Sequence, residues 1–351
     1  MKSEIFINNR RIGPEYPTYI VAEISANHNQ EFDQAVNLVM AAKEAGVDAI
    51  KLQTYTPDTL TIDCDNKYFN ISGSIWQGKT LYDLYGKAFT PWEWHPKLFE
   101  IAKKCGLDCF STPFDNSAID FLETLNVPAY KIASFEIVDL PLIRRVAATG
   151  KPLIMSTGMA SEDEIGEAVE AFYQAGGNQL ALLKCTSAYP AKPDSMNLST
   201  IIHMSRTFDV PVGISDHTLG IEVPMVAVAL GACIVEKHIT LSRRMPGPDS
   251  AFSLEPGEFK KLVDSVRIVE KTIGTVQYGS TESEKSSQIF RRSLFVVKDI
   301  RVGEHFNLDN VRSIRPGFGL PPKHLEQVLQ SRAKKNLKRG TPLSWDLIEE
   351  T

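Results

Sequence analysis

The sequence predicts an α/β protein in which a (β/α)8 barrel is followed by a small C-terminal module. Short runs of β-branched apolar residues alternate with amphipathic helical patterns along most of the chain, as in a barrel of eight strand–helix units. Beyond them, a polar stretch rich in Ser and Glu has the composition of a linker. We therefore expect a barrel domain at residues 1–278, a linker at 279–289 and a compact module at 290–351.

Composition argues against several classes of protein. The chain has 43% hydrophobic and 23% charged residues, as globular proteins do, and its formal charge of −5 offers no basic surface for nucleic acid. The N-terminal stretch from Met1 to Arg11 has no signal-type apolar core, and nothing later approaches the length of a membrane span. The five cysteines lack CxxC spacing, which favours reduced thiols. We expect a cytoplasmic protein with neither a nucleic-acid nor a membrane partner.

The apolar runs and the helical periods place each element. A hairpin is expected at residues 4–12, turning at Asn8 and Asn9. Strands are expected at 19–25, 48–53, 107–112, 129–134, 152–157, 180–186, 211–215 and 232–238. Helices are expected at 32–45, 91–104, 118–125, 140–149, 162–175, 198–207, 223–230 and 256–272.

One insertion interrupts this alternation, between the second strand and Thr90. It contains Tyr68, Trp76, Tyr82 and Tyr85, which makes it too aromatic for a disordered linker. No G-x-G-x-x-G opens the first helix and no phosphate-binding G-x-x-x-x-G-K-[ST] occurs, which argues against the usual nucleotide sites.

Two consecutive strands end in histidine. His217 follows Ser215 and Asp216, and His238 follows Glu236 and Lys237. Because the carboxyl ends of parallel strands meet at one rim, both imidazoles are expected there, beside carboxylates, as a divalent metal requires. The alternative is two separate histidines satisfied by backbone hydrogen bonds; the pairing favours the metal site.

Lysines and hydroxyls stand at the other strand ends. Lys51, Lys131 and Lys184 would repel one another at one mouth unless an anion lay among them. With neighbouring serines and threonines they indicate a cradle for phosphate or carboxylate, the alternative being lysines that reach out to water. Glu136, just past a strand, could then act as acid or base.

Polar motifs recur in order along the chain. They are Ala22-Glu-Ile-Ser-Ala-Asn-His-Asn29, Lys51-Leu-Gln53, Ser111-Thr-Pro-Phe-Asp115, Lys131-Ile-Ala-Ser134, Ser156-Thr-Gly-Met159, Cys185-Thr-Ser-Ala-Tyr-Pro190, Ser215-Asp-His-Thr218, Glu236-Lys-His-Ile-Thr240 and Gly247-Pro-Asp249. With Arg315-Pro-Gly near the C-terminus, this set resembles the sialic acid synthase family. The resemblance implies a barrel with a C-terminal antifreeze-like (SAF) domain and a transferase that condenses phosphoenolpyruvate with an acetamido sugar.

Within that family, the chain most resembles the pseudaminic acid synthases. The marks are Glu23-Ile-Ser-Ala-Asn-His28, Leu81-Tyr-Asp-Leu-Tyr85, Thr90-Pro-Trp-Glu-Trp-His95 and Gly247-Pro-Asp-Ser-Ala-Phe252. This implies the sugar 2,4-diacetamido-2,4,6-trideoxy-β-L-altropyranose; N-acetylneuraminate or legionaminate synthesis, from N-acetylmannosamine or its diacetamido analogue, is the alternative. Neuraminate synthases usually have glycine at Ser25 and histidine at Ser250. Gln30 departs from the family's usual glycine, with no expected effect on the chemistry.

The resemblance also implies roles for individual residues. His217 and His238 would bind a divalent metal, Mn²⁺ in preference to Mg²⁺ or Co²⁺. Phosphoenolpyruvate would be held by Lys51, Thr112, Lys131, Ser134, Ser156, Ser187 and Ser215. Tyr189 and Asp249 would lie near the sugar, and the catalytic set would be Glu23, Glu136, Glu236 and Arg315. Arg315 would come from the SAF domain of the second chain in a domain-swapped homodimer.

Two further functions are compatible with the residues. A Schiff-base aldolase would use Lys131 or Lys184. A non-enzymatic carbohydrate- or ice-binding protein would rely on the C-terminal module, and would leave the polar strand ends without a purpose.

Overall fold

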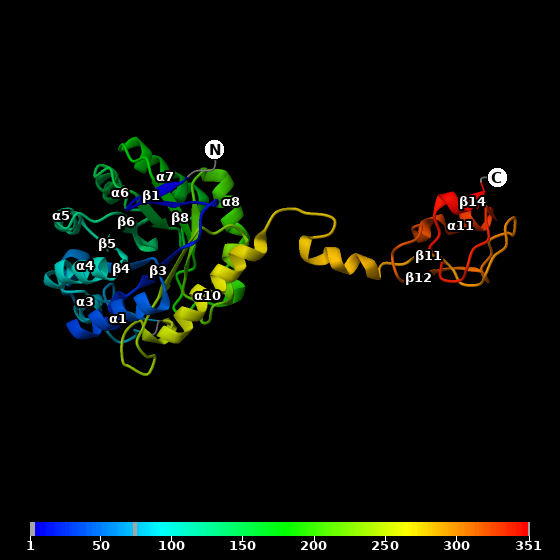
Figure 1. Ribbon diagram of the computed structural model, residues 1–351. Coiled ribbons are helices and arrows are strands. Elements are labelled where there is room, and N and C mark those ends of the chain that lie inside the picture. The colour runs from blue at the N-terminus through cyan, green and yellow to red at the C-terminus, as the bar shows by residue number, and fades with distance from the viewer. Residues whose placement is uncertain (1–3, 73–75, 350–351) are drawn as a thin grey trace. The chain divides into compact units, whose positions relative to one another are not determined.

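The computed structural model describes residues 4–72 and 76–349 and forms two compact units, Met1–Gly274 and Thr275–Thr351. The first unit is a closed barrel of eight parallel strands surrounded by helices (Figure 1). Its strands are β3 (Tyr19–Glu23), β4 (Ala49–Thr54), β5 (Asp108–Pro113), β6 (Tyr130–Ile132), β7 (Leu153–Ser156), β8 (Leu180–Cys185), β9 (Val212–Asp216) and β10 (Ile234–His238). They pair in chain order, and β10 closes the barrel against β3. The expected (β/α)8 barrel is confirmed.

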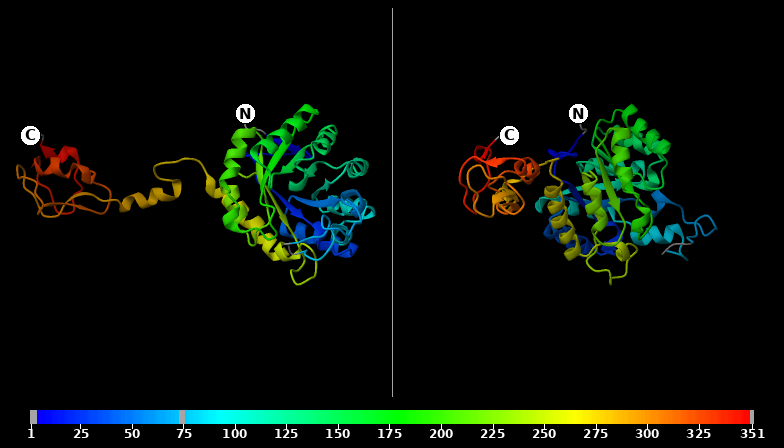
Figure 2. Two further views of the ribbon diagram at one scale, coloured as in Figure 1. Left: turned by 180° about the vertical axis from the view of Figure 1, so that it is seen from behind. Right: turned by 90° about the vertical axis from the view of Figure 1, so that its right-hand side faces the viewer.

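The helices cover the outside of the strands, as the two views of Figure 2 show. They are α1 (Phe32–Ala45), α4 (His95–Lys104), α5 (Asn116–Thr124), α6 (Leu140–Ala147), α7 (Glu162–Gln174), α8 (Ser199–Phe208), α9 (Glu222–Ala229) and α10 (Pro256–Ile273). One predicted helix, 91–104, is split into the 3-10 turn η2 (Trp92–Trp94) and α4. Pro96 has no N–H to donate back to Trp92, so a regular helix cannot run through this point.

Side-chain alternation along the strands builds the inside of the barrel. The inner apolar layer consists of Val21, Ala49, Phe110, Ala129, Ile154, Leu183 and Ile234, with Gly213 in β9. A Cβ on Gly213 would lie 2.4 Å from the carbonyl oxygen of Ile234, so this position has room for glycine alone. The predicted hairpin, β1 (Ile5–Ile7) and β2 (Arg10–Ile12), adds Ile5, Ile7 and Ile12 to the same cluster.

The next inward-facing layer is polar, because side chains of one strand return to the same face every second residue. Two residues beyond the apolar layer stand Glu23, Lys51, Thr112, Lys131, Ser156, Cys185, Ser215 and Glu236. The strands therefore carry an apolar floor and, directly above it, a ring of functional groups at the carboxyl end of the barrel.

The aromatic insertion after β4 is folded. It contains α2 (Pro57–Leu60) and α3 (Leu81–Ala88), and Thr80 caps α3 by accepting a hydrogen bond from the N–H of Asp83. Its residues 73–75 lie outside the described part of the chain.

The second unit has its own small core. Strand β11 (Ser293–Val296) pairs with β12 (Val311–Ile314), and β13 (Arg332–Ala333) pairs with β14 (Ile348–Glu349). Helix α11 (Leu325–Leu329) contributes Val328 to a cluster that includes Leu294 and Phe306. The units divide at Gly274, before the expected 278. An exposed 3-10 helix, η6 (Glu282–Phe290), covers most of the expected linker and the first residue of the expected module. In the described ranges, no helix has the length and apolar character that crossing a membrane requires.

Candidate active site

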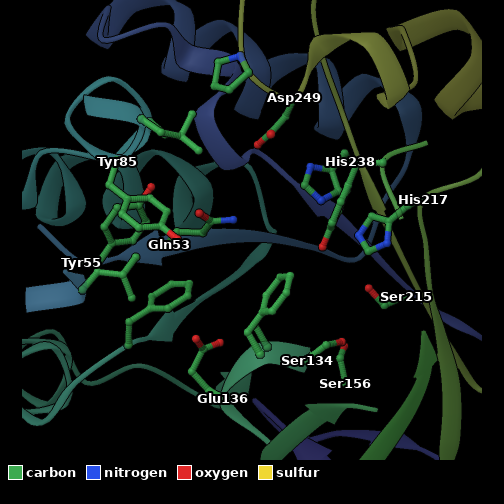
Figure 3. Close-up of a pocket in the computed structure, with 18 of the residues that line it drawn as sticks. Gln53, Tyr55, Tyr85, Ser134, Glu136, Ser156, Ser215, His217, His238 and Asp249 are labelled. Carbon is green, nitrogen blue, oxygen red and sulfur yellow. The ribbon is translucent and has the colours of Figure 1, made fainter. Parts of the chain in front are cut away.

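A cavity of about 430 Å³ lies at the carboxyl end of the barrel (Figure 3). Its polar lining comes from strand ends and the turns that follow them: Lys51, Gln53, Lys131, Ser134, Glu136, Ser156, Cys185, Ser215, His217, Glu236, His238 and Asp249. Its apolar lining comes largely from the insertion: Tyr55, Leu60, Ile71, Trp76, Leu81, Leu84, Tyr85 and Ala88. One cavity thus combines a charged, hydroxyl-rich floor with an apolar wall.

Two lysines and two glutamates form a buried charge cluster on this floor. Lys51 makes a short ion pair with Glu23 and lies 3.7 Å from Glu236, and Lys131 lies 3.9 Å from Glu236. Hydroxyl groups complete it. Thr112 Oγ1 lies 3.3 Å from Lys51 Nζ, Ser156 Oγ lies 2.6 Å from Lys131 Nζ, and Ser215 Oγ donates to Glu236 Oε1 over 3.1 Å.

Burial and pairing set the charges of the cluster. Burial lowers the pKa of Lys131, whereas Glu23 and Glu236 outweigh burial at Lys51 and raise its pKa. Burial raises the pKa of Glu23, while at Glu236 the two lysines overcome burial and hold the pKa below its ordinary value. The carboxylates therefore hold Lys51 and Lys131 in place beside the cavity, where an incoming phosphate or carboxylate could contact the same lysines.

The predicted third lysine of the cradle, Lys184, is not part of the cavity. Its Nζ donates to the carbonyl oxygen of Cys185 over 2.7 Å and to Thr186 Oγ1 over 3.3 Å. The reason is alternation: Lys184 stands one residue beyond the inward-facing Leu183, so its side chain leaves the strand on the opposite face. The expectation of three converging lysines was wrong at this position, and Cys185 occupies the inward place.

The two histidines lie together, as predicted, with ring centroids 5.3 Å apart. His217 Nδ1 lies 3.3 Å from the carbonyl oxygen of Thr186, whereas His238 Nδ1 is buried without a hydrogen-bond partner. Burial lowers the pKa of His238 well below its ordinary value, so its ring is neutral and offers a free lone pair. Phe252 packs against both rings, with centroids 6.1 Å from His217 and 5.0 Å from His238.

This arrangement fits a divalent metal held by two imidazoles. Within residues 4–72 and 76–349, no group of three or more His, Cys, Asp or Glu side chains is placed to hold a metal ion. An ion here would complete its coordination with oxygen atoms of water or substrate, leaving an open position as catalytic sites do.

The remaining predicted contacts lie around the same cavity. Asp249 accepts hydrogen bonds from the hydroxyl of Ser25 and, over 3.4 Å, from the N–H of Ala26. Tyr189 packs between His217 and Trp76, with centroids 4.5 Å and 5.8 Å away. Figure 3 shows Tyr55 and Tyr85 on the side of the cavity opposite His217 and His238. A sugar lying between these sides would contact both.

Ser134 and Ser187 meet at a glycine that sequence reasoning missed. Gly158 donates its N–H to Ser134 Oγ over 3.0 Å, and a Cβ on Gly158 would lie 2.2 Å from Ser187 Oγ. A larger residue would displace both hydroxyls. Gly158 was visible within the Ser156-Thr-Gly-Met159 motif, but its role depends on two segments distant in sequence.

Two other predicted residues lie elsewhere. Ser250 does not line the cavity; its hydroxyl donates to the carbonyl oxygens of Met245 and Gly247 over 3.0 Å and 3.2 Å, inside its own loop. Arg315 belongs to the second unit, where its side chain is exposed.

Comparison with known proteins assigns the family. Residues 38–278 match the NeuB family and residues 291–349 match the SAF domain. The chain belongs to the NeuB family. The resemblance drawn from the motifs is thereby confirmed.

The relatives of this NeuB-family protein share most of its length. It is 44% identical to a pseudaminic acid synthase of Helicobacter pylori, over 95% of this chain and 99% of the relative. It is 45% identical to a pseudaminic acid synthase of Campylobacter jejuni, over 93% of this chain and 95% of the relative. A solved N-acetylneuraminic acid synthetase of Leptospira borgpetersenii, in complex with citrate, is 33% identical with a TM-score of 0.73, covering 82% of this chain and 95% of that one.

Glu136 generates a prediction about pH. Burial raises its pKa to about 7, and its Oε2 atom is buried without a hydrogen-bond partner. Because the folded state favours the protonated acid, this contribution to stability is complete below the ordinary pKa of 4.5 and is lost as pH rises through about 7. Glu136→Gln should remove this part of the pH dependence and unfold at a higher urea concentration than the wild type at pH 8.

Urea unfolding at pH 5 and pH 8, followed by tryptophan fluorescence, measures this effect. Glu164→Gln is the control, because Glu164 caps α7 at the surface through Ser161 and should leave the slope between the two pH values intact. An unchanged slope in Glu136→Gln would show that Glu136 is ionised in the folded protein throughout this range.

Proposed function

We propose that this chain is a pseudaminic acid synthase. It would condense phosphoenolpyruvate with 2,4-diacetamido-2,4,6-trideoxy-β-L-altropyranose and water to give pseudaminic acid and phosphate. The observation that carries the proposal is that Lys51 and Lys131 line the same cavity as an apolar wall made largely by the insertion. The higher identity to pseudaminic acid synthases than to the solved neuraminic acid synthetase supports the choice of sugar.

The chemistry requires one end of the cavity to hold an anion. Lys51, Lys131 and the hydroxyls around them would bind the phosphate and carboxylate of phosphoenolpyruvate and keep its C3 atom facing the sugar aldehyde. Attack of C3 on the aldehyde carbon leaves positive character at C2, where water adds. The resulting tetrahedral intermediate releases inorganic phosphate and leaves a 2-keto acid.

A carboxyl group that lines the cavity can carry out proton transfer. Glu136, with a pKa of about 7, can take the proton of the attacking water or return one to the new hydroxyl. Glu23 and Glu236 keep the lysines oriented until the anion arrives.

We propose a divalent cation on His217 and His238, Mn²⁺ in preference to Mg²⁺ or Co²⁺. When bound, it would act as a Lewis acid toward the aldehyde oxygen of the sugar. The unpartnered Nδ1 of His238 and the neutral state of its ring support this proposal. The packing of Phe252 against both rings would keep them oriented.

Specific observations argue against two of the three alternative functions. Neuraminate or legionaminate synthesis would place a different sugar against the same wall. A Schiff-base aldolase needs a free lysine in the cavity. Lys184 points away from the cavity. Lys131 donates to Ser156 and, over 3.0 Å, to the carbonyl oxygen of Ile132. A non-enzymatic role leaves the buried charge cluster unexplained.

Substrate choice tests the proposed function. The apolar wall should favour a sugar with a methyl group at C6, since one methyl in an apolar pocket changes selectivity by about 10–200-fold. Phosphate release should be measured with phosphoenolpyruvate and each of three sugars: the 6-deoxy-altrose, N-acetylmannosamine, and the diacetamido precursor of legionaminate. The first should give a higher kcat/KM than N-acetylmannosamine, which has a hydroxyl group at C6 in place of the methyl. The highest value for the diacetamido precursor would assign legionaminate synthesis instead. A higher value for N-acetylmannosamine would assign neuraminate synthesis instead.

The histidine pair generates a prediction about metal dependence. His217→Ala or His238→Ala should reduce turnover by at least about 10²-fold and weaken Mn²⁺ binding, because each removes one of two imidazole ligands. Turnover after chelation and Mn²⁺ readdition, together with calorimetric Mn²⁺ titration, measures both effects. His203→Ala, on the exposed face of α8, is the control. Near-normal turnover of either metal-stripped variant would contradict the metal assignment.

We propose that the enzyme acts as a domain-swapped homodimer in which Arg315 of one chain completes the site of the other. Charge supports docking of a second unit on a barrel: residues 291–351 carry 12 Lys and Arg against 7 Asp and Glu, whereas residues 1–290 carry 26 against 36. Exposed apolar side chains in the segments that follow β6, β7 and β9, namely Phe135, Met159 and Leu219, would be covered by such a lid.

The five cysteines are all free thiols, which is consistent with a cytoplasmic location.

Complementation tests the shared site. His238→Ala and Arg315→Ala proteins, each inactive alone, should recover part of the activity when mixed under conditions that exchange subunits. About one quarter of wild-type turnover is expected, because half of the dimers are mixed and each mixed dimer has one intact site. Subunit exchange is verified with two affinity tags. Exchange without recovery would place Arg315 in the site of its own chain or outside any site.

A further inference from the structure

Most of the apolar wall of the cavity comes from one segment, of which the structure describes residues 55–72 and 76–89. Tyr55, Leu84 and Tyr85 are among its contributions, and the rings of Tyr55 and Tyr85 meet edge to face with centroids 5.7 Å apart. The N-terminal end of the segment continues from β4, so the hydrogen bonds of the barrel fix it. Its C-terminal end, after α3, leads through coil into the short turn η2. Besides its contacts with α2, the position of α3 therefore depends on what holds this second end.

His28 contacts Thr90, which follows the C-terminal end of the segment. It ends the turn η1 (Ser25–His28), which follows β3 and packs against α3. Its Nδ1 accepts the N–H of Gln30 over 3.1 Å, and its Nε2 lies 3.1 Å from Thr90 Oγ1. Because Nδ1 accepts, the neutral ring carries its proton on Nε2 and donates it to Thr90. Both His28 and Thr90 are buried, so this hydrogen bond has no competition from water.

Gln30 holds the end of α3 itself. Its side-chain Nε2 donates to the carbonyl oxygen of Phe89 and also reaches that of Lys87, 3.5 Å away. The last carbonyls of a helix have no partner within the helix, so Gln30 supplies donors that α3 lacks. Its backbone φ is 60°, a conformation in which glycine is unstrained and a side chain is not. A residue other than the family's usual glycine is thus placed where its amide reaches α3.

We propose that Gln30 and His28 are positioning residues that fix the C-terminal end of α3 and, through it, the wall against which the sugar binds. Neither side chain lines the cavity, so both act through α3 and Thr90. The sugar part of the inference rests on the proposed function; the structural part, that these two residues hold α3, does not.

Gln30→Ala and Gln30→Gly test the proposal in the full-length protein. Both should raise the KM for the sugar by about three- to tenfold, the effect of losing one hydrogen bond in the wall. Both should leave the KM for phosphoenolpyruvate unchanged, because Lys51 and Lys131 stand on barrel strands. In hydrogen–deuterium exchange without substrate, the amides of α3 and Phe89 should exchange faster than in the wild type. Gln30→Gly relieves the backbone strain, so its Tm should exceed that of Gln30→Ala although its sugar KM is also raised.

Two further variants sharpen the result. Thr90→Val removes the acceptor of His28 without changing η1 and should shift exchange and sugar KM in the same direction. Gln174→Ala removes an exposed glutamine hydrogen bond to Glu170 in α7, 2.6 Å long, and should change neither quantity.

The overturning outcomes are distinct. Wild-type exchange in α3 together with wild-type sugar KM in Gln30→Gly would refute the proposal, since glycine would then hold the wall as well. Equal increases in both KM values would show that the whole mouth is disturbed and would also refute it. If none of the three sugars is turned over by the wild type, the proposed function fails, and exchange in α3 still decides whether Gln30 and His28 hold it.

Discussion

Two lysines and two glutamates meet at the mouth of the barrel with 1–5% of their surfaces exposed, and they must pair with one another because water cannot solvate them. An unpaired charge at such a depth costs several kcal/mol, so each strand that carries one depends on its neighbours. The closure of β10 against β3 therefore does more than complete a sheet: it brings Glu236 to the side of the barrel that holds Lys51 and Glu23. A substrate anion bound here would share Lys51 and Lys131 with Glu23 and Glu236 and would not displace them, because either carboxylate left alone at this depth would carry the same penalty.

Most of the fold could be predicted because its information is local. An apolar run bounded by turn residues marks a strand wherever it packs, and the helix 32–45 was placed residue for residue because its periodicity and Gly46 mark both ends. The site could be predicted in part, because the carboxyl ends of all strands in a barrel converge on one cavity. His217, His238, Lys51 and Lys131 follow from that rule together with the family motifs, without further knowledge of packing.

Sequence reasoning fails where the outcome depends on which face of a strand a side chain leaves from, or on contacts between residues distant in sequence. Lys184 was expected in the cavity because strand ends were considered without alternation; counting by two from Leu183 would have selected Cys185. Ser250, where neuraminate synthases usually have histidine, distinguishes the sequence without lining the cavity, because its hydroxyl is satisfied within its own loop. The role of Gly158 depends on Ser134 and Ser187, which approach it only in the folded barrel. Such contacts leave no periodic trace in a sequence.

Contacts on the outward faces of the same strands help to hold the two histidines close together. Lys237 and Asp216 are fully buried and joined over 2.5 Å, and Lys237 also donates to the carbonyl oxygen of Thr218 over 2.5 Å. Asp216 in turn accepts from the N–H of Thr218 over 2.9 Å. This pair ties β9 to β10 at the residues adjacent to His217 and His238. Because a buried ion pair is weak as a source of stability but strict in its geometry, its main contribution here is to the position of the two imidazoles. The inward-facing side chains of β9 and β10 line the cavity, and the outward-facing ion pair keeps the two strands, and with them His217 and His238, in position.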